Sequence, residues 1–359
     1  MLLVAIFLCL NFKAAFVRQD SGHVALFFAD ALVLFAVLCA PHVMRGRALT
    51  AAAVSIVMVA AAHGTFDVGQ AIDPVQHARN AIDQTRTLAT GARREALRAS
   101  FVTRVRQEVP IPDRLRALVG DRTVSAWPNS QGSALYAYGL NWRPIVTSEP
   151  YALYTPRLDA LAARQLASER APERVLRTLD EPIDRRFAAF EAPRATLALL
   201  CRFRELGRDR TWQVLAVADD RCGSPRALRT VEAPWGEAVE VPRASRDDML
   251  VRVKVDGTRP AGLERLRALG LRPRTRFVEL GDSGFRLVEA TAADGLLVHA
   301  PADADFRPPF NVVSNVDTIT VVRDGGNPGG TLRYSFEEIP VRPLRDDRRD
   351  RRARGAKRR

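Results

Sequence analysis

Three apolar stretches stand at the start of the chain, at residues 1–10, 24–43 and 48–62, with short polar breaks between them. A helix needs about 20 residues to span the hydrocarbon core of a bilayer. The second stretch meets that length, and the third is marginal. The first reaches it only if residues 11–17 continue the helix. The pattern therefore predicts two or three transmembrane helices within residues 1–63.

A cleaved signal peptide is the alternative for residues 1–10. Such a peptide carries basic residues before its apolar run and a small-residue cleavage site after it. Here the basic residues Lys13 and Arg18 follow the run. We therefore expect the first stretch to be a span of a chain that begins further upstream.

The orientation follows from the charges of the short loops. Arg45 and Arg47 lie between the second and third stretches with no acid beside them, which places this turn in the cytoplasm by the positive-inside rule. The loop 11–23 and everything after residue 64 are then outside. The expected localisation is the inner (cytoplasmic) membrane of a bacterium, multi-pass, with the large domain extracytoplasmic.

Beyond residue 64 the pattern first predicts helices and then a layer of strands and helices. Apolar positions recur near a helical period from residue 73 to about 109. Strands alternating with helices then predict a small α/β layer. The expected helices are 113–118, 157–166 and 195–206, the expected strands are 123–127, 174–179 and 212–218, and 134–138 is either a helical turn or a strand.

From about residue 238 the apolar runs become short and alternating, and Gly, Pro or Asp bound them. Strands at that spacing are typical of an antiparallel β-sandwich. They are expected at 238–241, 249–255, 275–279, 285–289, 295–299, 318–322 and 331–336, with one helix at 262–269.

The predicted fold class is α+β, with two or three N-terminal transmembrane helices, an exported α/β layer and an antiparallel β-sandwich. The predicted regions are a transmembrane region 1–63, a helical connector 64–120, an α/β subdomain 121–230, a β-sandwich subdomain 231–342 and a disordered basic tail 343–359.

The formal net charge is +13, and residues 345–359 contribute nine Arg or Lys against three Asp. Such a tail is typical of a disordered terminus. The rest of the chain lacks aromatic residues interleaved on a basic face and shows no recognisable nucleic-acid motif, so nucleic acid is not an expected partner.

Cys201 and Cys222 are the two cysteines beyond the apolar region. In an oxidising compartment they are expected to pair across a loop of roughly 20 residues, and two buried thiols are the alternative. Cys9 and Cys39 lie within apolar stretches. No CxxC and no Cys/His cluster is present, so no metal site and no cofactor are expected.

Two short segments resemble a known type of protein. Residues 12–23 resemble a loop of large bacterial polytopic membrane proteins of glycosyltransferase-C-like type. Residues 137–156 are similar to a block in the outer domain that follows the last spans of those proteins. The matching positions of that block are Asn141, Trp142, Arg143, Pro144, Tyr151, Tyr154, Thr155 and Pro156.

The resemblance implies a role with lipid-linked sugars or envelope glycans. Enzymes of this type use an acid in an early outward loop near their first span, and that loop has no counterpart here. The resemblance therefore implies a partial or non-catalytic glycosyltransferase-like module, whose partners are membrane lipids and a polyprenyl-phosphate sugar or an envelope glycan. Protein partners are not identified by it.

The loop 11–23 gathers Lys13, Arg18, Asp20 and His23. Arginine forks onto phosphate and histidine titrates near neutrality, so this loop is a candidate for a lipid-phosphate site, and ordinary interfacial anchoring is the alternative. Asp30 is an acid inside the second apolar stretch, where it is expected to pair with a basic residue.

Four of the five tyrosines of the chain fall within residues 136–154, together with a tryptophan. Aromatic faces beside amide and guanidinium groups are what a carbohydrate-binding cleft uses, and a tight core loop is the alternative. The candidate glycan-binding residues are Asn141, Trp142, Arg143, Tyr151 and Tyr154.

No catalytic residue is predicted. Only His77 and His299 lie beyond residue 63 among the histidines, and no G-x-S-x-G elbow, P-loop or dinucleotide fingerprint occurs. The spacing of Glu149 and Asp159 does not favour a glycosidase pair. Whether the protein is an enzyme stays open, and a scaffolding protein with an exported binding domain is the alternative function.

Overall fold

The computed structural model describes residues 6–13, 27, 74–128, 132–148, 152–178, 185–268, 274–300 and 316–342. The chain divides into two compact units. The first unit comprises Met1–Leu97 and Pro260–Arg274, and the second comprises Arg98–Arg259 and Thr275–Arg359.

The predicted fold class is wrong in its membrane part. Within the described ranges, no helix has the length and apolarity needed to cross a bilayer. The longest of these helices, α6 (Gly91–Glu108), has 18 residues but carries five arginines. Most of residues 1–63, including the second and third apolar stretches, lies outside the described residues. The described residues form an α+β arrangement whose three sheets are rich in antiparallel pairs.

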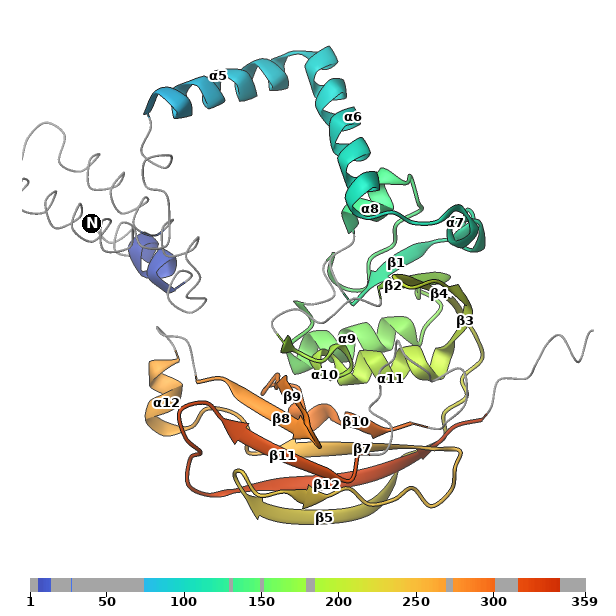
Figure 1. Ribbon diagram of the computed structural model, residues 1–359, viewed down its shortest axis with the longest axis vertical. Coiled ribbons are helices and arrows are strands. Elements are labelled where there is room, and N and C mark those ends of the chain that lie inside the picture. Colours follow the sequence, from blue (N-terminus) through green and yellow to red (C-terminus); the bar gives the residue numbers. More distant parts are fainter. Residues whose placement is uncertain are drawn as a thin grey trace, which may run out of the picture. The chain divides into compact units, whose positions relative to one another are not determined.

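The helix predicted from residue 73 to about 109 is present as two helices, α5 (Pro74–Ala89) and α6 (Figure 1). They are separated at Thr90, whose carbonyl still accepts a hydrogen bond from the Arg94 amide. The apolar positions Val75 and Ile82 of α5 are exposed. The first unit also contains the short helix α12 (Gly262–Arg267).

The second unit contains a mixed four-stranded sheet with the strand order β1-β2-β4-β3. Strands β1 and β2 are parallel, and the other two pairings are antiparallel. The sequence predicted three of these strands but expected residues 203–206 to continue a helix. The strands are β1 (Val124–Trp127), β2 (Arg174–Thr178), β3 (Phe203–Arg208) and β4 (Trp212–Val217).

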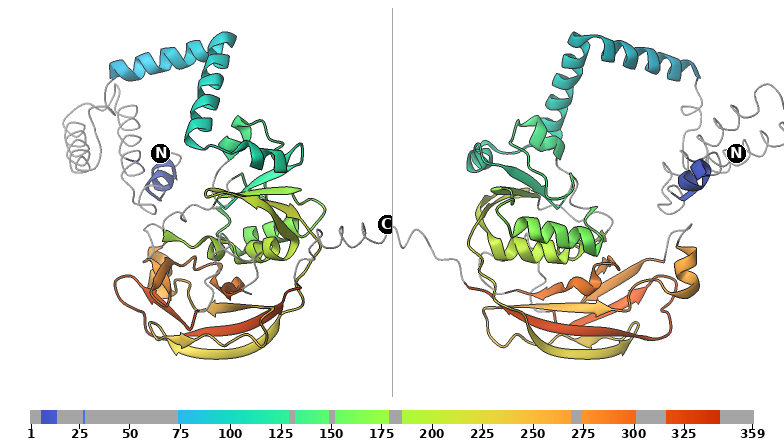
Figure 2. Two further views of the ribbon diagram at one scale, coloured as in Figure 1. Left: turned by 45° about the vertical axis from the view of Figure 1, so that its right-hand side comes forward. Right: turned by 180° about the vertical axis from the view of Figure 1, so that it is seen from behind.

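Helices cover both faces of this sheet, so its inner strands β2 and β4 are buried on both sides. Val124, Leu176 and Trp212 pack with α6, α7 and α8 on one face. Val175 and Leu215 point to the other face, where they pack with α9 and α11 (Figure 2). The helices are α7 (Asp113–Val119), α8 (Gly132–Ala137), α9 (Pro156–Leu166) and α11 (Pro193–Arg202). The short helix α10 (Ala188–Glu191) precedes α11 and packs in the core of the two sheets described next.

Two antiparallel four-stranded sheets, with the orders β10-β7-β12-β5 and β6-β11-β8-β9, face each other across a second core. Val253 and Tyr334 enter this core from the first sheet, and Val278 and Ile319 enter it from the second. Leu250 points from the first sheet into the core that contains α9 and α11, so these helices lie between the mixed sheet and this pair of sheets (Figure 2).

The elements of this β-sandwich are β5 (Arg226–Pro234), β6 (Val239–Glu240), β7 (Met249–Asp256), β8 (Arg276–Leu280), β9 (Ser283–Arg286), η4 (Ala292–Asp294), β10 (Leu296–His299), β11 (Thr318–Arg323) and β12 (Thr331–Pro340).

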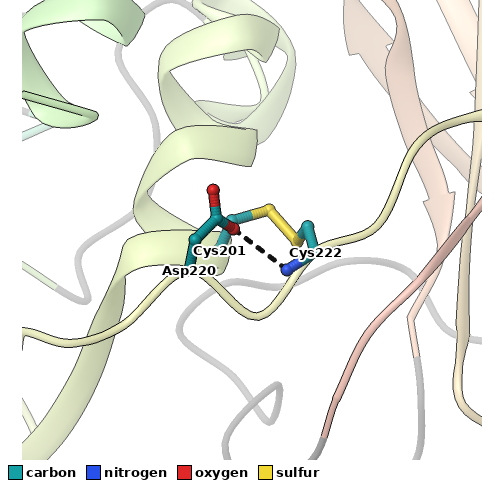
Figure 3. A group of neighbouring side chains, drawn as sticks. All are labelled: Cys201, Asp220 and Cys222. Atoms are coloured by element: carbon teal, nitrogen blue, oxygen red, sulfur yellow. Dashed lines mark hydrogen bonds between the residues drawn. A yellow bond between two sulfur atoms is a disulfide. The ribbon is translucent and has the colours of Figure 1, made fainter.

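A short linker joins β4 to β5 and is fixed on two sides. The Gly223 amide donates a hydrogen bond to the Pro340 carbonyl at the end of β12, at 2.8 Å. Cys222 of the linker and Cys201 at the end of α11 form a disulfide (Figure 3). The sequence allowed either a disulfide or two buried thiols at Cys201 and Cys222, and the structure contains the disulfide. This bond joins α11 to the linker that leads from the mixed sheet into the sandwich.

Candidate ligand-binding surface

The segment 141–143 is held against the edge of the mixed sheet by two backbone hydrogen bonds. The Val124 amide donates to the Asn141 carbonyl at 2.8 Å, and the Arg143 amide donates to the Val124 carbonyl at 2.8 Å. Trp142 thereby forms a parallel bridge with Val124. Consecutive side chains of an extended segment point to opposite sides. The sheet edge therefore fixes the direction of the Trp142 side chain and sends Asn141 and Arg143 the other way.

The indole of Trp142 lies on Gly132, the first residue of α8. A β-carbon at Gly132 would come within 3.2 Å of Trp142 Cζ2 and 3.3 Å of Cη2, so a side chain at this position would press on the ring. Glycine allows this close approach. Although its position is fixed, the Trp142 side chain remains 40% exposed.

A second aromatic ring projects from the same side of α8. Tyr136 follows Gly132 by four residues, and residues four apart in a helix lie on one face with their β-carbons about 5–6 Å apart. The Tyr136 side chain is 46% exposed. Phe101 of α6 supports it, with ring centroids 6.3 Å apart. We call these two exposed rings, Trp142 on Gly132 and Tyr136 one helical turn further along, the α8 platform.

The guanidinium of Arg98 lies over the Tyr136 ring, with its Cζ 5.4 Å from the ring centroid. This is within the range of a cation–π interaction, in which the cation is attracted to the negative face of the ring. A sugar ring presents C–H groups that are attracted to the same negative face. The α8 platform therefore offers a stacking surface with a cation at its end.

Tyr138, two residues further on, has a structural role instead. Its hydroxyl accepts a hydrogen bond from the Ile111 amide at 3.1 Å. The guanidinium groups of Arg106 and Arg116 lie over its ring at 5.2 and 5.1 Å from the centroid. These contacts join the end of α8 to α6 and α7 and so hold the platform in place.

The structure divides the five glycan-binding candidates. Trp142 belongs to the platform, whereas Asn141 and Arg143 are exposed on the opposite side of their segment. Tyr154 is exposed just before α9 and belongs neither to α8 nor to the segment 141–143. Tyr151 lies outside the described residues. The sequence analysis did not identify Arg98, nor the contact of Gly132 with the Trp142 ring. The spacing of four residues between Gly132 and Tyr136, which places both on one face of a helix, is visible in the sequence.

Of the four lipid-phosphate candidates, one belongs to the described residues. Lys13 is exposed at the end of the helical residues 6–13. Arg18, Asp20, His23 and the acid Asp30 lie outside the described residues.

Asp220 lies beside the disulfide (Figure 3). Its Oδ1 accepts a hydrogen bond from the Cys222 amide at 3.0 Å, and its Oδ2 is 3.6 Å from Arg202 Nη1. The thiolate is the form of cysteine that binds metals, and the two sulfurs here are bonded to each other. In this state the three residues form a braced turn.

Asp159 is a buried acid whose role the sequence did not reveal. Its Oδ2 accepts a hydrogen bond from the Arg194 amide at 3.0 Å, and its Oδ1 accepts one from the Ala195 amide at 2.8 Å. Both amides belong to the first turn of α11, whose own N-cap residue Ala192 provides no side-chain acceptor. Burial raises the pKa of Asp159 to about 6 despite these two hydrogen bonds. Asp159 of α9 therefore caps α11 from 35 residues away.

No protein-family model matches the chain, and neither a curated protein nor a solved structure matches it.

Proposed function

We propose that this protein is a non-catalytic glycan-binding protein of an oxidising, extracytoplasmic compartment, and that the α8 platform holds the sugar. The observation that carries the proposal is the Trp142 indole, which is 40% exposed yet fixed on Gly132 and on the edge of β1. A large apolar ring that is both exposed to water and held in one position is unfavourable for the free protein, and ligand binding would account for it. A ring that is already in place loses little conformational entropy when a ligand stacks on it.

The disulfide supports the compartment. Disulfides persist in oxidising compartments and are rare where thiols are kept reduced. Cys201 is buried and ends α11, while Cys222 is in the linker. The resemblance of residues 137–156 to outer domains of glycosyltransferase-C-like proteins points to the same side of the cell and to sugars as ligands.

Glycan binding is tested with immobilised glycans and the variant Trp142→Ala. Removal of the indole is expected to weaken binding by about tenfold or more, since about 1.4 kcal/mol of lost stacking corresponds to tenfold. Tyr154→Ala is the matched control, because it removes an exposed ring that precedes α9 and is not part of the α8 platform. Absence of binding to every glycan by the wild-type protein would refute the proposal.

The compartment is tested by alkylating the protein as it is isolated from its own cells, without reductant. Cys201 and Cys222 are expected to resist the reagent, and the free thiol of Cys9 serves as the internal positive control. Alkylation of Cys222 in most molecules would contradict an oxidising location.

A protein ligand is the second candidate for the same surface. Trp, Tyr and Arg are the residues enriched at the energetic centres of protein interfaces, and the platform consists of these three. Capture of one defined protein partner that is lost in Trp142→Ala, combined with silence on glycans, would favour this alternative.

A further inference from the structure

We infer that the glycan held by the α8 platform is anionic and that Arg98 binds its acidic group. This inference rests on the proposed glycan binding and specifies the class of sugar. It starts from the position of Arg98, the first residue of the second unit, whose guanidinium lies over the exposed Tyr136 ring.

The Arg98 guanidinium is placed to bind an oxyanion. Its Cζ lies 5.4 Å from the centroid of the Tyr136 ring, and a contact with the ring face does not use the N–H donors of the group. That edge matches the two oxygens of a carboxylate, a sulfate or a phosphate in a bidentate contact. Within the described residues, no acid forms an ion pair with Arg98, whereas the neighbouring Arg116 is paired with Asp113.

The charge of the segment that carries the platform favours the same ligand class. Residues 98–148 contain seven arginines and no lysine, against the three acids Glu108, Asp113 and Asp121. An excess of positive charge raises the local concentration of anions and repels cationic ligands. A neutral sugar would use the rings of the platform but not this charge.

The geometry also suits a chain of sugars. Trp142 lies over the position of Gly132, and Tyr136 is one helical turn further along α8. A sugar ring that stacks on Trp142 can therefore be followed by a second sugar that extends along α8 toward Tyr136, with its acidic group near Arg98. An acidic polysaccharide or an acidic oligosaccharide meets this requirement.

The experiment compares oligogalacturonides with the same oligosaccharides after reduction of their carboxyl groups, on a glycan array that also contains other acidic and neutral pairs. The wild-type protein is expected to bind acidic members about tenfold or more tightly than their neutral counterparts. Added salt is expected to reduce that preference.

Variants at Arg98 and Trp142 show which residue causes the preference for acidic members. Arg98→Gln is expected to abolish the difference between acidic and neutral members, and Arg98→Lys is expected to restore only part of it because lysine lacks the planar fork. Trp142→Ala is expected to weaken both members equally. Arg104→Gln, an equal charge change at an exposed position of α6, is the matched control and is expected to keep the preference.

The outcomes separate the two proposals. Binding that depends on Trp142 but is equal for acidic and neutral members, or an acidic preference that survives in Arg98→Gln, would overturn the inference and leave glycan binding intact. Silence of the wild-type protein on the whole array would overturn both. Thermal unfolding of each variant shows whether it is folded.

Discussion

The mixed-sheet part and the β-sandwich part of the second unit differ in where they leave aromatic rings exposed. In the sandwich, Tyr334 and Phe336 of β12 are buried between the two sheets, and Phe187 and Phe190 pack on each other with ring centroids 4.8 Å apart. The strands of the mixed sheet also bury their rings, as Trp212 shows, but Tyr136, Trp142 and Tyr154, which lie outside those strands, remain exposed.

The difference follows from how each part encloses its core. Two sheets facing each other leave little room for an aromatic ring except inside, because side chains from both inner faces interdigitate. A sheet covered by separate short helices has edges and helix ends where a ring can be fixed by backbone contacts and still be exposed. Binding residues are disproportionately found in such connecting segments. The cores of both parts contribute to stability, and the ligand surface that we propose lies at the edge of the mixed sheet.

The largest expected effect is loss of a sandwich ring. Phe336→Ala removes a side chain that is 1% exposed, and such a change leaves a cavity that costs about 3–5 kcal/mol of unfolding free energy. Urea denaturation measures it. A cost below about 1 kcal/mol would show that the sandwich core is not the main source of stability.

Removal of the disulfide is expected to have the next largest effect. Cys222→Ser should lower the free energy of unfolding by about 3 kcal/mol, because a covalent link between residues 21 apart restricts the unfolded chain. Guanidinium denaturation of the variant and of the reduced wild-type protein should give similar losses. Cys9→Ser is the control, and an equal loss in that variant would exclude a specific role for the disulfide.

The cap formed by Asp159 is expected to make stability depend on pH. Its pKa in the folded protein is raised to about 6 from the ordinary value of 3.8, so the folded state binds more protons than the unfolded state between these values. The contribution of this group is therefore fully present below about pH 4 and is lost as the pH rises through about 6, by up to about 3 kcal/mol.

Asp159→Asn removes this titration while it keeps one oxygen to accept a hydrogen bond from α11. The unfolding free energies of wild type and variant are measured at intervals from pH 4 to pH 7. As the pH rises, the wild-type protein should lose stability relative to the variant. Parallel curves for the two proteins would show that the carboxyl of Asp159 does not titrate with a raised pKa.

The smallest expected effect on stability concerns the platform. Trp142→Ala should change the free energy of unfolding by less than about 1 kcal/mol, because a largely surface ring contributes little to the core. The same variant should nevertheless lose most ligand binding. A loss of stability as large as that of Phe336→Ala would mean that Trp142 is a core residue and would remove the contrast between the two parts.

Several elements could be predicted because their residues carry the signal themselves. The alternation in β7 and β11 and the turn residues around them identified sandwich strands, and the periodicity of residues 73–109 identified the helical region as one helix, which the structure divides at Thr90 into α5 and α6. β5 was missed because, as an edge strand, it exposes eight of its nine residues fully or partly in no simple alternation. β3 was missed because the apolar spacing of α11 continues into it, and only its pairing with β4 ends the helix.

The membrane prediction had a different basis. It depended on hydropathy alone, which measures how apolar a segment is and not what it packs against. The described helices α5 and α6 carry too many arginines to span a bilayer. Only residues 6–13 and Phe27 of the apolar region belong to the described part of the chain.

By itself, the sequence determined the α+β class, most of the strands, and the two cysteines that were able to pair. It also placed aromatic residues densely within residues 136–154. The tertiary structure decided which of those rings are exposed, that Trp142 lies on Gly132, that Arg98 lies over Tyr136, and that Asp159 caps a helix distant from it in the chain. The physical reason is that periodicity reports contacts within a few residues, whereas exposure, capping and stacking depend on which distant segments the folded backbone brings together.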